Sequence, residues 1–210
     1  MSSPAILVVC ALLPELRYAQ LPEGVEVLAC GVGPVEAAIA VATELARTRY
    51  DAVLNAGLAG AYRTSASVGD AVLVVDETYA ELGLEGGGPL ALPEGARLAA
   101  RVDADPALLR RCAASAPSLP RVRGLTVAQI TATDATAQRL AERYATDVES
   151  MEGFSVLRAA ALAKVPALEV RGISNYVGAR DRSEWDFAAG ARATARALES
   201  VLQSLVEEFP

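Results

Sequence analysis

The chain of 210 residues is 52% hydrophobic, carries a net charge of −7 and contains no histidine. The missing histidine excludes Ser-His-Asp hydrolysis, Cys-His nucleophiles and most zinc sites, so we expect no metal site. The acidic balance argues against nucleic-acid binding through a basic face. No run approaches the roughly 20 apolar residues of a membrane span, so we expect no membrane partner.

The N-terminus and the cysteines indicate the compartment. Residues 1–4 carry no basic segment of the kind that begins a signal peptide. Three cysteines, Cys10, Cys30 and Cys112, leave an odd one, which favours free buried thiols in a reducing cytoplasm over a disulfide. We therefore expect a cytoplasmic protein.

Apolar runs, helical spacing and breaks at glycine and proline predict the elements in chain order. They are a strand at 5–11, a strand at 25–30, a helix at 35–48, strands at 51–56 and 71–76, a helix at 105–115, a strand at 122–130, a helix at 134–144, a strand at 147–149, a helix at 151–164, a strand at 167–174 and a helix at 185–208. The last helix has an apolar face of Phe187, Ala191, Leu198, Val201, Leu202 and Leu205. The alternation predicts an α/β fold of three layers in a single domain, residues 1–210.

The segment from Gly31 to Glu36, read Gly-Val-Gly-Pro-Val-Glu, partly matches a dinucleotide-binding turn. Glu36 stands where that motif has glycine or alanine, and its charge would repel a pyrophosphate. We favour a tight turn into a helix, in which small residues also let a ribose or a water approach the backbone. We expect no cofactor.

Three charged residues and the single tryptophan are candidate site residues, each with a simpler alternative. Glu15 and Glu152 each lie at the start of a predicted helical turn, where a carboxylate can instead complement the helix dipole. Arg171 interrupts a buried strand and needs a partner, so a structural ion pair with Glu15 or Glu152 competes with a catalytic role. Trp185 is more often a core residue than a ligand contact.

The two asparagines of the chain, Asn55 and Asn175, are both predicted where a strand gives way to a loop. Ligands of open α/β sheets bind at the carboxyl ends of the strands. A side-chain amide both donates and accepts, so it can read a heterocycle edge with one donor and one acceptor. The N7–H and O6 of a protonated hypoxanthine form such an edge. Together with the acidic residues Glu15 and Glu152, this amide indicates a nucleoside-cleaving enzyme.

Several motifs in order carry a resemblance to a known family. They are Glu15 after the first strand, Gly31-Val32-Gly33, Asn55-Ala56-Gly57-Leu58-Ala59-Gly60, Val68-Gly69-Asp70, Val148-Glu149-Ser150-Met151-Glu152-Gly153 and Val170-Arg171-Gly172-Ile173-Ser174-Asn175. This series resembles the nucleoside phosphorylase/nucleosidase superfamily, nearest to the 5′-methylthioadenosine/S-adenosylhomocysteine nucleosidases. Within that group, the segment 172–186 resembles the futalosine hydrolases of menaquinone biosynthesis. The resemblance implies a mixed central sheet flanked by helices.

The resemblance also implies roles for individual residues. Glu15 matches the carboxylate that activates water, Met151 the residue packed under the sugar, and Glu152 the carboxylate that binds the 2′- and 3′-hydroxyls. Arg171 matches an arginine near the attacking water. Asn175 takes the place of an aspartate that protonates purine N7, and Trp185 lines the pocket of the 5′ substituent. We also assign Gly33, Gly57 and Ile130 to substrate binding.

Two departures from the family pattern bear on the reaction. Leu58 replaces a serine that helps to hold water in the nucleosidases, and Asn175 cannot act as a carboxylic acid. Phosphorylases hold phosphate partly with an arginine where this chain has Asn55, and with small and basic residues where it has Leu12, Leu13 and Pro14. We therefore expect hydrolysis, with hypoxanthine as the leaving base. A methylthioadenosine/S-adenosylhomocysteine nucleosidase, a purine nucleoside phosphorylase and a non-catalytic nucleoside sensor stay as alternatives.

The 5′ end of the substrate and the assembly are the least determined features. Arg180 or Arg182, with Trp185, can supply charge and stacking to an aryl carboxylate, or the arginines can be solvated beside Asp181 and Glu184. Relatives form homo-oligomers in which a neighbour's loop closes the pocket. We therefore expect a homo-oligomer, with the glycine-rich segment 81–97 as the closing loop.

Overall fold

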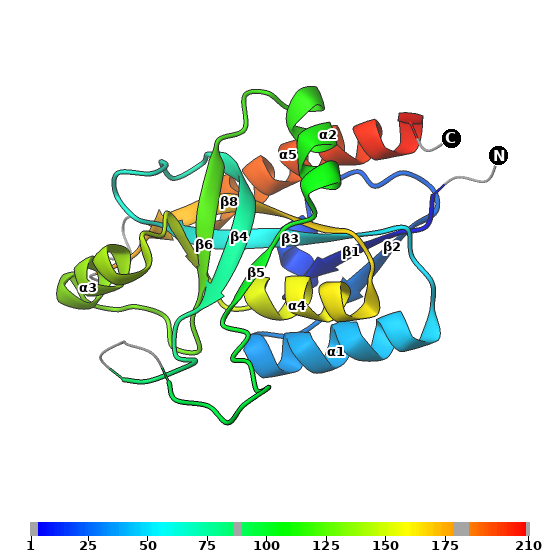
Figure 1. Cartoon of the computed structure of the whole chain (residues 1–210). Helices are drawn as coiled ribbons and strands as arrows, with labels where there is room; N and C mark the ends of the chain where they lie inside the picture. The colour runs from blue at the N-terminus through cyan, green and yellow to red at the C-terminus, as the bar shows by residue number, and fades with distance from the viewer. Residues whose placement is uncertain (1–3, 86–89, 179–184, 209–210) are drawn as a thin grey trace.

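The computed structural model describes residues 4–85, 90–178 and 185–208. These residues form a mixed eight-stranded sheet with helices on both faces (Figure 1). In chain order the elements are β1 (Ile6–Cys10), the 3₁₀ helix η1 (Leu13–Leu16), β2 (Val25–Ala29), α1 (Pro34–Arg47), β3 (Ala52–Ala61), β4 (Ala71–Tyr79), β5 (Arg101–Asp103), α2 (Pro106–Ser115), β6 (Arg121–Thr126), α3 (Asp134–Tyr144), β7 (Val148–Ser150), α4 (Gly153–Ala163), β8 (Ala167–Tyr176) and α5 (Phe187–Glu208). The expected α/β arrangement of three layers is present.

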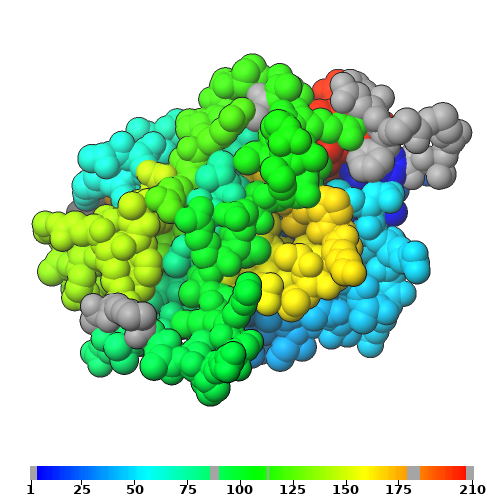
Figure 2. Space-filling view, viewed as in Figure 1, coloured from blue at the N-terminus to red at the C-terminus, as the bar shows by residue number. Residues whose placement is uncertain are grey.

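Both faces of the central strands are covered, which explains their nearly continuous apolar sequences. In β1, Ile6, Val8 and Cys10 pack in one core cluster with α2 and α5. Leu7 and Val9 point the other way and pack with α1 and α4. Figure 2 shows α4 and α1 lying side by side on the outer surface of that second layer.

Five strands close into a ring at one end of the sheet. β3 pairs with β7, β7 with β6, β6 with β4, β4 with β8, and β8 again with β3. Ring closure is possible because β3 has ten residues: its first half pairs with β1 and β8, and its end pairs with β7 and β8. The inside of the ring is where polar side chains of these strands meet.

The prediction that the third strand ends at residue 56 is wrong. β3 continues through Gly57, Leu58, Ala59 and Gly60 to Ala61. Glycine normally weakens a strand, but it also marks sites where another group approaches the backbone closely, and that is its use here. Asn55 therefore lies inside a strand and is only 1% exposed, so its predicted position at a strand end is wrong as well.

Close packing of β8 against α5 fixes the position of the C-terminal helix. A Cβ atom on Gly172 would overlap the carbonyl oxygen of Gly190. The hydroxyl of Thr194 on α5 donates to the carbonyl of Gly57 on β3 at 2.9 Å. These contacts bring the start of α5 beside the ends of β3 and β8, next to the pocket described below.

Most of the expected apolar face of α5 is buried, with one exception. Ala191, Leu198, Val201, Leu202 and Leu205 belong to the core. Phe187 is 55% exposed, so its assignment to the core face is wrong. It lies in the first turn of α5 and lines the pocket described below. No helix within the described residues is both long and apolar enough to cross a bilayer.

Candidate active site

A cavity of about 380 Å³ lies at the carboxyl ends of β1, β7 and β8, beside the second half of β3. Six of the nine predicted site residues line it: Glu15, Ile130, Met151, Glu152, Asn175 and Trp185. Carboxylates, an amide and apolar side chains therefore meet in one pocket, at the sheet edge where α/β proteins bind ligands.

Glu15 lies in the 3₁₀ helix that follows β1, and backbone amides hold its carboxylate. Its Oε2 accepts from the amide of Leu12 at 3.1 Å, and its Oε1 accepts from the amide of Leu58 at 3.3 Å. Leu58 thus contributes its N–H, a group that any residue at that position supplies. The two bonds fix a partly buried carboxylate at the pocket wall, with lone pairs left for a water molecule.

Glu152 is the N-cap residue of α4 and is 5% exposed. Its Oε1 accepts from the amide of Gly33 at 2.8 Å. Burial raises the pKa of Glu152, while the charge of Arg171 and the bond from Gly33 oppose that rise. Gly33 has φ of 97°, in the left-handed region that favours glycine, and it acts on the pocket through Glu152.

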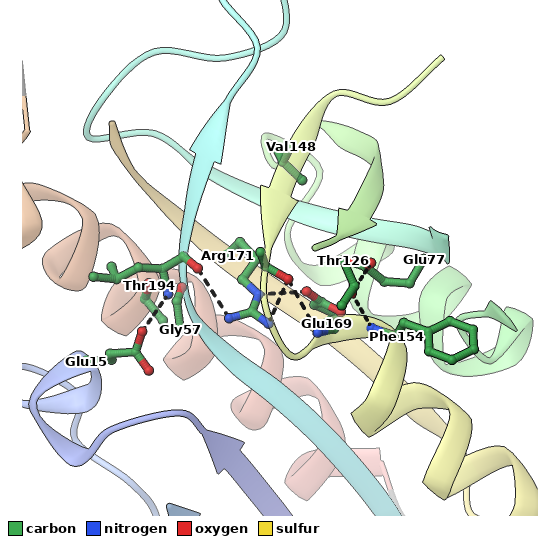
Figure 3. A network of polar contacts seen from close by, with 12 residues as sticks. Glu15, Gly57, Glu77, Thr126, Val148, Phe154, Glu169, Arg171 and Thr194 are labelled. Carbon is green, nitrogen blue, oxygen red and sulfur yellow. Dashed lines mark hydrogen bonds and ion pairs between the residues drawn. The ribbon is translucent and has the colours of Figure 1, made fainter. Parts of the chain in front are cut away.

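Arg171 lies behind the pocket wall and is 1% exposed. Its Nε donates to Glu169 Oε1 at 2.6 Å, so the structural partner is Glu169 and the predicted pairing with Glu15 or Glu152 is wrong. Residues two apart on a strand share a face, which explains this pairing. Its other nitrogens donate to the Leu58 carbonyl at 3.3 Å and to Ser150 Oγ at 3.4 Å. Figure 3 shows the guanidinium at the centre of this network.

Gly57 allows the arginine and the catalytic candidate Glu15 to approach the same point of β3. A Cβ atom at position 57 would lie 2.8 Å from Arg171 Nη1 and 3.1 Å from Glu15 Oε2. Both distances are shorter than a normal carbon contact, so a side chain there would displace one of the two groups. Gly57 therefore contributes to the site by leaving space for the side chains of Arg171 and Glu15.

A β-bulge sets the direction of Asn175. The register of β3 and β8 shifts between Ala59 and Gly60, so that Ser174 is the extra residue. Neighbouring residues of a regular strand point to opposite faces, but here Ser174 and Asn175 both line the cavity. The bulge therefore presents a hydroxyl and an amide side by side.

Two hydrogen bonds orient the Asn175 amide. Its Nδ2 donates to the Tyr176 carbonyl at 3.0 Å, and its Oδ1 accepts from the Ser174 hydroxyl at 2.8 Å. A carbonyl only accepts, so the NH₂ group must face Tyr176. One N–H and one lone pair of the amide are left for a ligand.

Apolar and aromatic groups close the rest of the pocket. Ile130 is 43% exposed at the rim, and the ring of Trp185 lies edge-on to Phe187, with 5.3 Å between centroids. The sequence reasoning missed Phe187 as a pocket residue because its helical spacing matches the core face of α5. Arg180 and Arg182 lie outside the described residues.

Glu149 is a second pocket residue that the sequence reasoning did not single out. It is 6% exposed, its Oε1 accepts from the amide of Thr131 at 3.0 Å, and its Oε2 accepts from the Thr131 hydroxyl at 2.6 Å. Burial raises the pKa of Glu149. A carboxylate inside an apolar strand was the available signal, the same one that marked Arg171.

Thiol chemistry does not fit this site. Cys10 and Cys30 are buried free thiols beside the pocket-forming segments. Burial raises the pKa of Cys10 to about 12 and that of Cys30 to about 11. Because the thiolate is the nucleophilic form, both side chains stay inert at neutral pH. Among residues 4–85, 90–178 and 185–208, no cluster of three His, Cys, Asp or Glu side chains is arranged to hold a metal.

Comparisons with known proteins give the family. A family model described as Phosphorylase superfamily matches residues 15–209. The futalosine hydrolase of Streptomyces coelicolor is 36% identical over 200 residues, which is 91% of this chain and 85% of that protein. The futalosine hydrolase of Thermus thermophilus is 38% identical over 180 residues, which is 83% of this chain and 80% of that protein. The chain belongs to the futalosine hydrolases.

Solved structures of lower sequence identity share the fold of this chain. The futalosine hydrolase of Helicobacter pylori has a TM-score of 0.81 at 15% identity and covers 94% of this chain and 97% of that one. A 5′-methylthioadenosine/S-adenosylhomocysteine nucleosidase of Colwellia psychrerythraea, solved with adenine, has a TM-score of 0.81 at 19% identity and covers 97% of this chain and 96% of that one. The predicted nucleoside phosphorylase-like fold is confirmed, and family membership makes the chain an N-glycosyl hydrolase.

Proposed function

We propose that this chain hydrolyses the N-glycosidic bond of futalosine and releases hypoxanthine and dehypoxanthine futalosine, as a step of menaquinone biosynthesis. Curated relatives named futalosine hydrolase support this substrate. The observation that carries the proposal is an oriented amide, Asn175, in the same pocket as two carboxylates, Glu15 and Glu152. We also propose that residues 1–210 form one catalytic domain.

The two carboxylates act on the two reactants, one on the attacking water and the other on the sugar. Cleavage of an N-glycosidic bond passes through a sugar with oxocarbenium character, as glycoside hydrolysis does. Glu15, held by two backbone amides, deprotonates the attacking water. Glu152 binds the ribose hydroxyls, and its negative charge stabilises the cation that develops on the sugar. Met151 packs under the ribose, and Arg171 keeps the wall behind the water in place.

Asn175 reads the leaving base. The free N–H of its amide donates to O6 of the purine, and the free lone pair of Oδ1 accepts from N7–H. A 6-aminopurine presents a donor at C6, which faces the amide N–H without a partner. Such a mismatch costs about 1–3 kcal/mol, or roughly ten- to a hundredfold in selectivity for the 6-oxopurine.

Hydrolysis is favoured over phosphorolysis because, among the described residues, the positions at which phosphorylases hold phosphate carry no basic side chain. The position of the phosphorylase arginine holds Asn55, which is buried inside β3, and Leu12 lines the pocket on the other side. The expected reaction proceeds at the same rate with and without phosphate. Formation of a ribosyl 1-phosphate product would contradict hydrolysis.

A substrate panel tests the proposal. Purified protein is incubated with futalosine, its 6-amino analogue, inosine and methylthioadenosine, and free base is quantified by chromatography. Futalosine should give the highest kcat/KM, ahead of its 6-amino analogue by roughly ten- to a hundredfold. Preference for methylthioadenosine would support the related nucleosidase activity, and binding of futalosine without release of base would identify a sensor.

The buried thiols and the exposed apolar side chains bear on the cellular location and the oligomeric state. Three buried free thiols, Cys10, Cys30 and Cys112, support a cytoplasmic location. Exposed apolar side chains near the pocket mouth support a homo-oligomer, since such groups gather at protein interfaces. They are Leu12 (51% exposed), Leu13 (61%), Val32 (51%), Val35 (65%) and Ile39 (61%). Residues 86–89 of the segment 81–97, which we expect to close a neighbour's pocket, lie outside the described residues.

A further inference from the structure

Behind the pocket, two glutamates and one arginine share a fully enclosed space. Glu77 on β4 and Glu169 on β8 are both 0% exposed, and Arg171 is 1% exposed. Arg171 forms an ion pair with Glu169, in which Nε lies 2.6 Å from Glu169 Oε1. Glu77 has a neutral partner, the Thr126 hydroxyl, which donates to its Oε2 at 2.8 Å. One cation therefore faces two acidic groups.

The remaining oxygens of the two carboxyl groups lie against the same glycine. Glu77 Oε1 and Glu169 Oε2 receive no hydrogen bond from any N–H or O–H group of the described residues. A Cβ atom on Gly153 would lie 2.7 Å from Glu169 Oε2 and would overlap Glu77 Oε1. A Cβ atom on Gly124 would overlap Glu77 Oε1 as well. Two glycines thus form a slot in which these oxygens meet.

Two ionised carboxylates in such a slot would repel each other without water to screen them. A single proton between them removes the repulsion and satisfies both unpartnered oxygens at once. Burial raises the pKa of Glu77 well above its ordinary value, and the charge of Glu169 raises it further. Because Arg171 stabilises the negative charge on Glu169, the proton belongs on Glu77.

We propose that Glu77 is a protonated carboxylic acid at neutral pH, that it donates a hydrogen bond to Glu169, and that the pair acts as a positioning unit for Arg171. Glu169 then carries one negative charge against one guanidinium, and the buried group is neutral as a whole. This proposal rests on the proposed function only in its predicted effect on kcat.

The pair connects the segments that carry the proposed catalytic residues. From Glu169 the network runs through Arg171 to the Leu58 carbonyl, next to the amide that holds Glu15. In the other direction, Thr126 Oγ1 accepts from the amide of Phe154 at 2.7 Å, in the first turn of α4, whose N-cap residue is Glu152. Figure 3 shows the two parts of this network, one from Glu15 to Arg171 and Glu169 and the other from Glu77 through Thr126 to Phe154. A neutral network leaves the negative charges of Glu15 and Glu152 free to face the ribosyl cation.

Infrared difference spectroscopy at neutral pH tests the shared proton directly. A protonated carboxyl group absorbs above the amide band, in a region free of carboxylate absorption. The wild-type spectrum should contain this band, and Glu77→Gln should remove it, whereas Glu23→Gln, a change of an exposed glutamate, should keep it. Absence of the band from the wild type, or its persistence in Glu77→Gln, would overturn the proposal. This readout does not depend on the identity of the substrate.

Kinetics of three variants test the positioning role. Glu77→Gln retains a donor toward Glu169 and an acceptor for Thr126, so kcat should stay within about threefold, since only an isosteric polar pair is exchanged. Glu77→Leu strands an oxygen of Glu169, and Glu169→Gln leaves Arg171 without its counter-charge. Both should lower kcat at least about tenfold with a smaller change in KM. If Glu77→Gln loses as much activity as Glu77→Leu, the proposal is wrong, and a variant that fails to fold leaves the infrared comparison to decide.

Discussion

The carboxylate of Glu15 is the group on which the proposed chemistry depends most. We expect Glu15→Gln to lower kcat for hypoxanthine release by about a hundredfold or more, because a positioned general base contributes about 10²–10⁴-fold. The neutral amide still accepts from one backbone N–H, so the fold should persist. Glu23→Gln, at an exposed position, is the matched control and should leave kcat unchanged. Equal loss in both variants, or none in Glu15→Gln, would refute the assignment.

The amide of Asn175 sets base preference in the proposed mechanism. In Asn175→Asp, the oxygen that replaces Nδ2 faces the Tyr176 carbonyl, which only accepts, so the new carboxyl group must be protonated to keep that contact. The lone pairs of that oxygen can accept from a 6-amino group, toward which Nδ2–H could only donate, so kcat/KM for the 6-amino analogue relative to futalosine should rise roughly ten- to a hundredfold. Unchanged selectivity in a substrate competition assay would discard this role.

Individual residues differ in how far their surroundings follow from the sequence. Glu15, Met151, Glu152 and Asn175 lie in one pocket, as the family motifs predict, while their roles stay predictions. The Arg171–Glu169 pair could be predicted from strand periodicity, because residues two apart share a face. The position of Glu77 could not be predicted, since nothing in the sequence indicates that β4 pairs with β8 beside Gly153.

Strand β3 connects the proposed water site to the base site through two glycines. A Cβ at Gly57 would displace Arg171 or Glu15, whereas a Cβ at Gly60 would lie 2.9 Å from Asn175 Nδ2. We therefore expect Gly57→Ala to reduce kcat, by about 10²-fold if the carboxylate moves by 1 Å. Gly60→Ala should mainly raise KM and weaken selectivity for the 6-oxopurine. Steady-state kinetics of the two variants on futalosine and its 6-amino analogue separate the effects, and identical kinetic defects would contradict this division.

The same strand shows why element boundaries were harder to predict than elements. The segment Gly57–Gly60 has the composition of a loop. Its two glycines nevertheless fit in a strand, because the side chains of Arg171, Glu15 and Asn175 fill the space beside them. The bulge at Ser174 is equally hidden in the sequence, since it follows from the register between β3 and β8. By contrast, helix α3 has the predicted bounds, because Thr133 caps its first turn and its apolar spacing is regular.

At the scale of the whole molecule, the alternation of strands and helices was sufficient to predict three layers. Closure of five strands into a ring was not predictable from local patterns, because it depends on β3 and β4 both pairing with β8. The ring creates the enclosed space in which polar residues of β4 and β8 meet. Local sequence therefore determines the layers, and long-range pairing determines the site behind the pocket.

The buried thiols give a test of the packed state as a whole. Burial raises the pKa from 9.0 to about 12 for Cys10 and to about 11 for Cys30 and Cys112. Thiolate therefore forms in the native protein only as the pH approaches these values. The contribution of the thiols to stability is complete below pH 9.0 and is lost as the pH rises through the pKa values of the folded protein. At pH 8 a thiol reagent should react slowly with native protein and with three groups after unfolding. Rapid labelling of the folded protein would show that the two faces of the sheet are not covered as described.

The most direct test of the central claim is a crystal structure of the protein with hypoxanthine bound. The claim predicts Asn175 Nδ2 at about 3 Å from O6 and Oδ1 at about 3 Å from N7, with the bonds to Tyr176 and Ser174 retained. Glu15 and Glu152 should then face the space beyond N9, where the ribose was attached. A base bound with the Asn175 amide turned away from it, or bound outside this pocket, would contradict the claim.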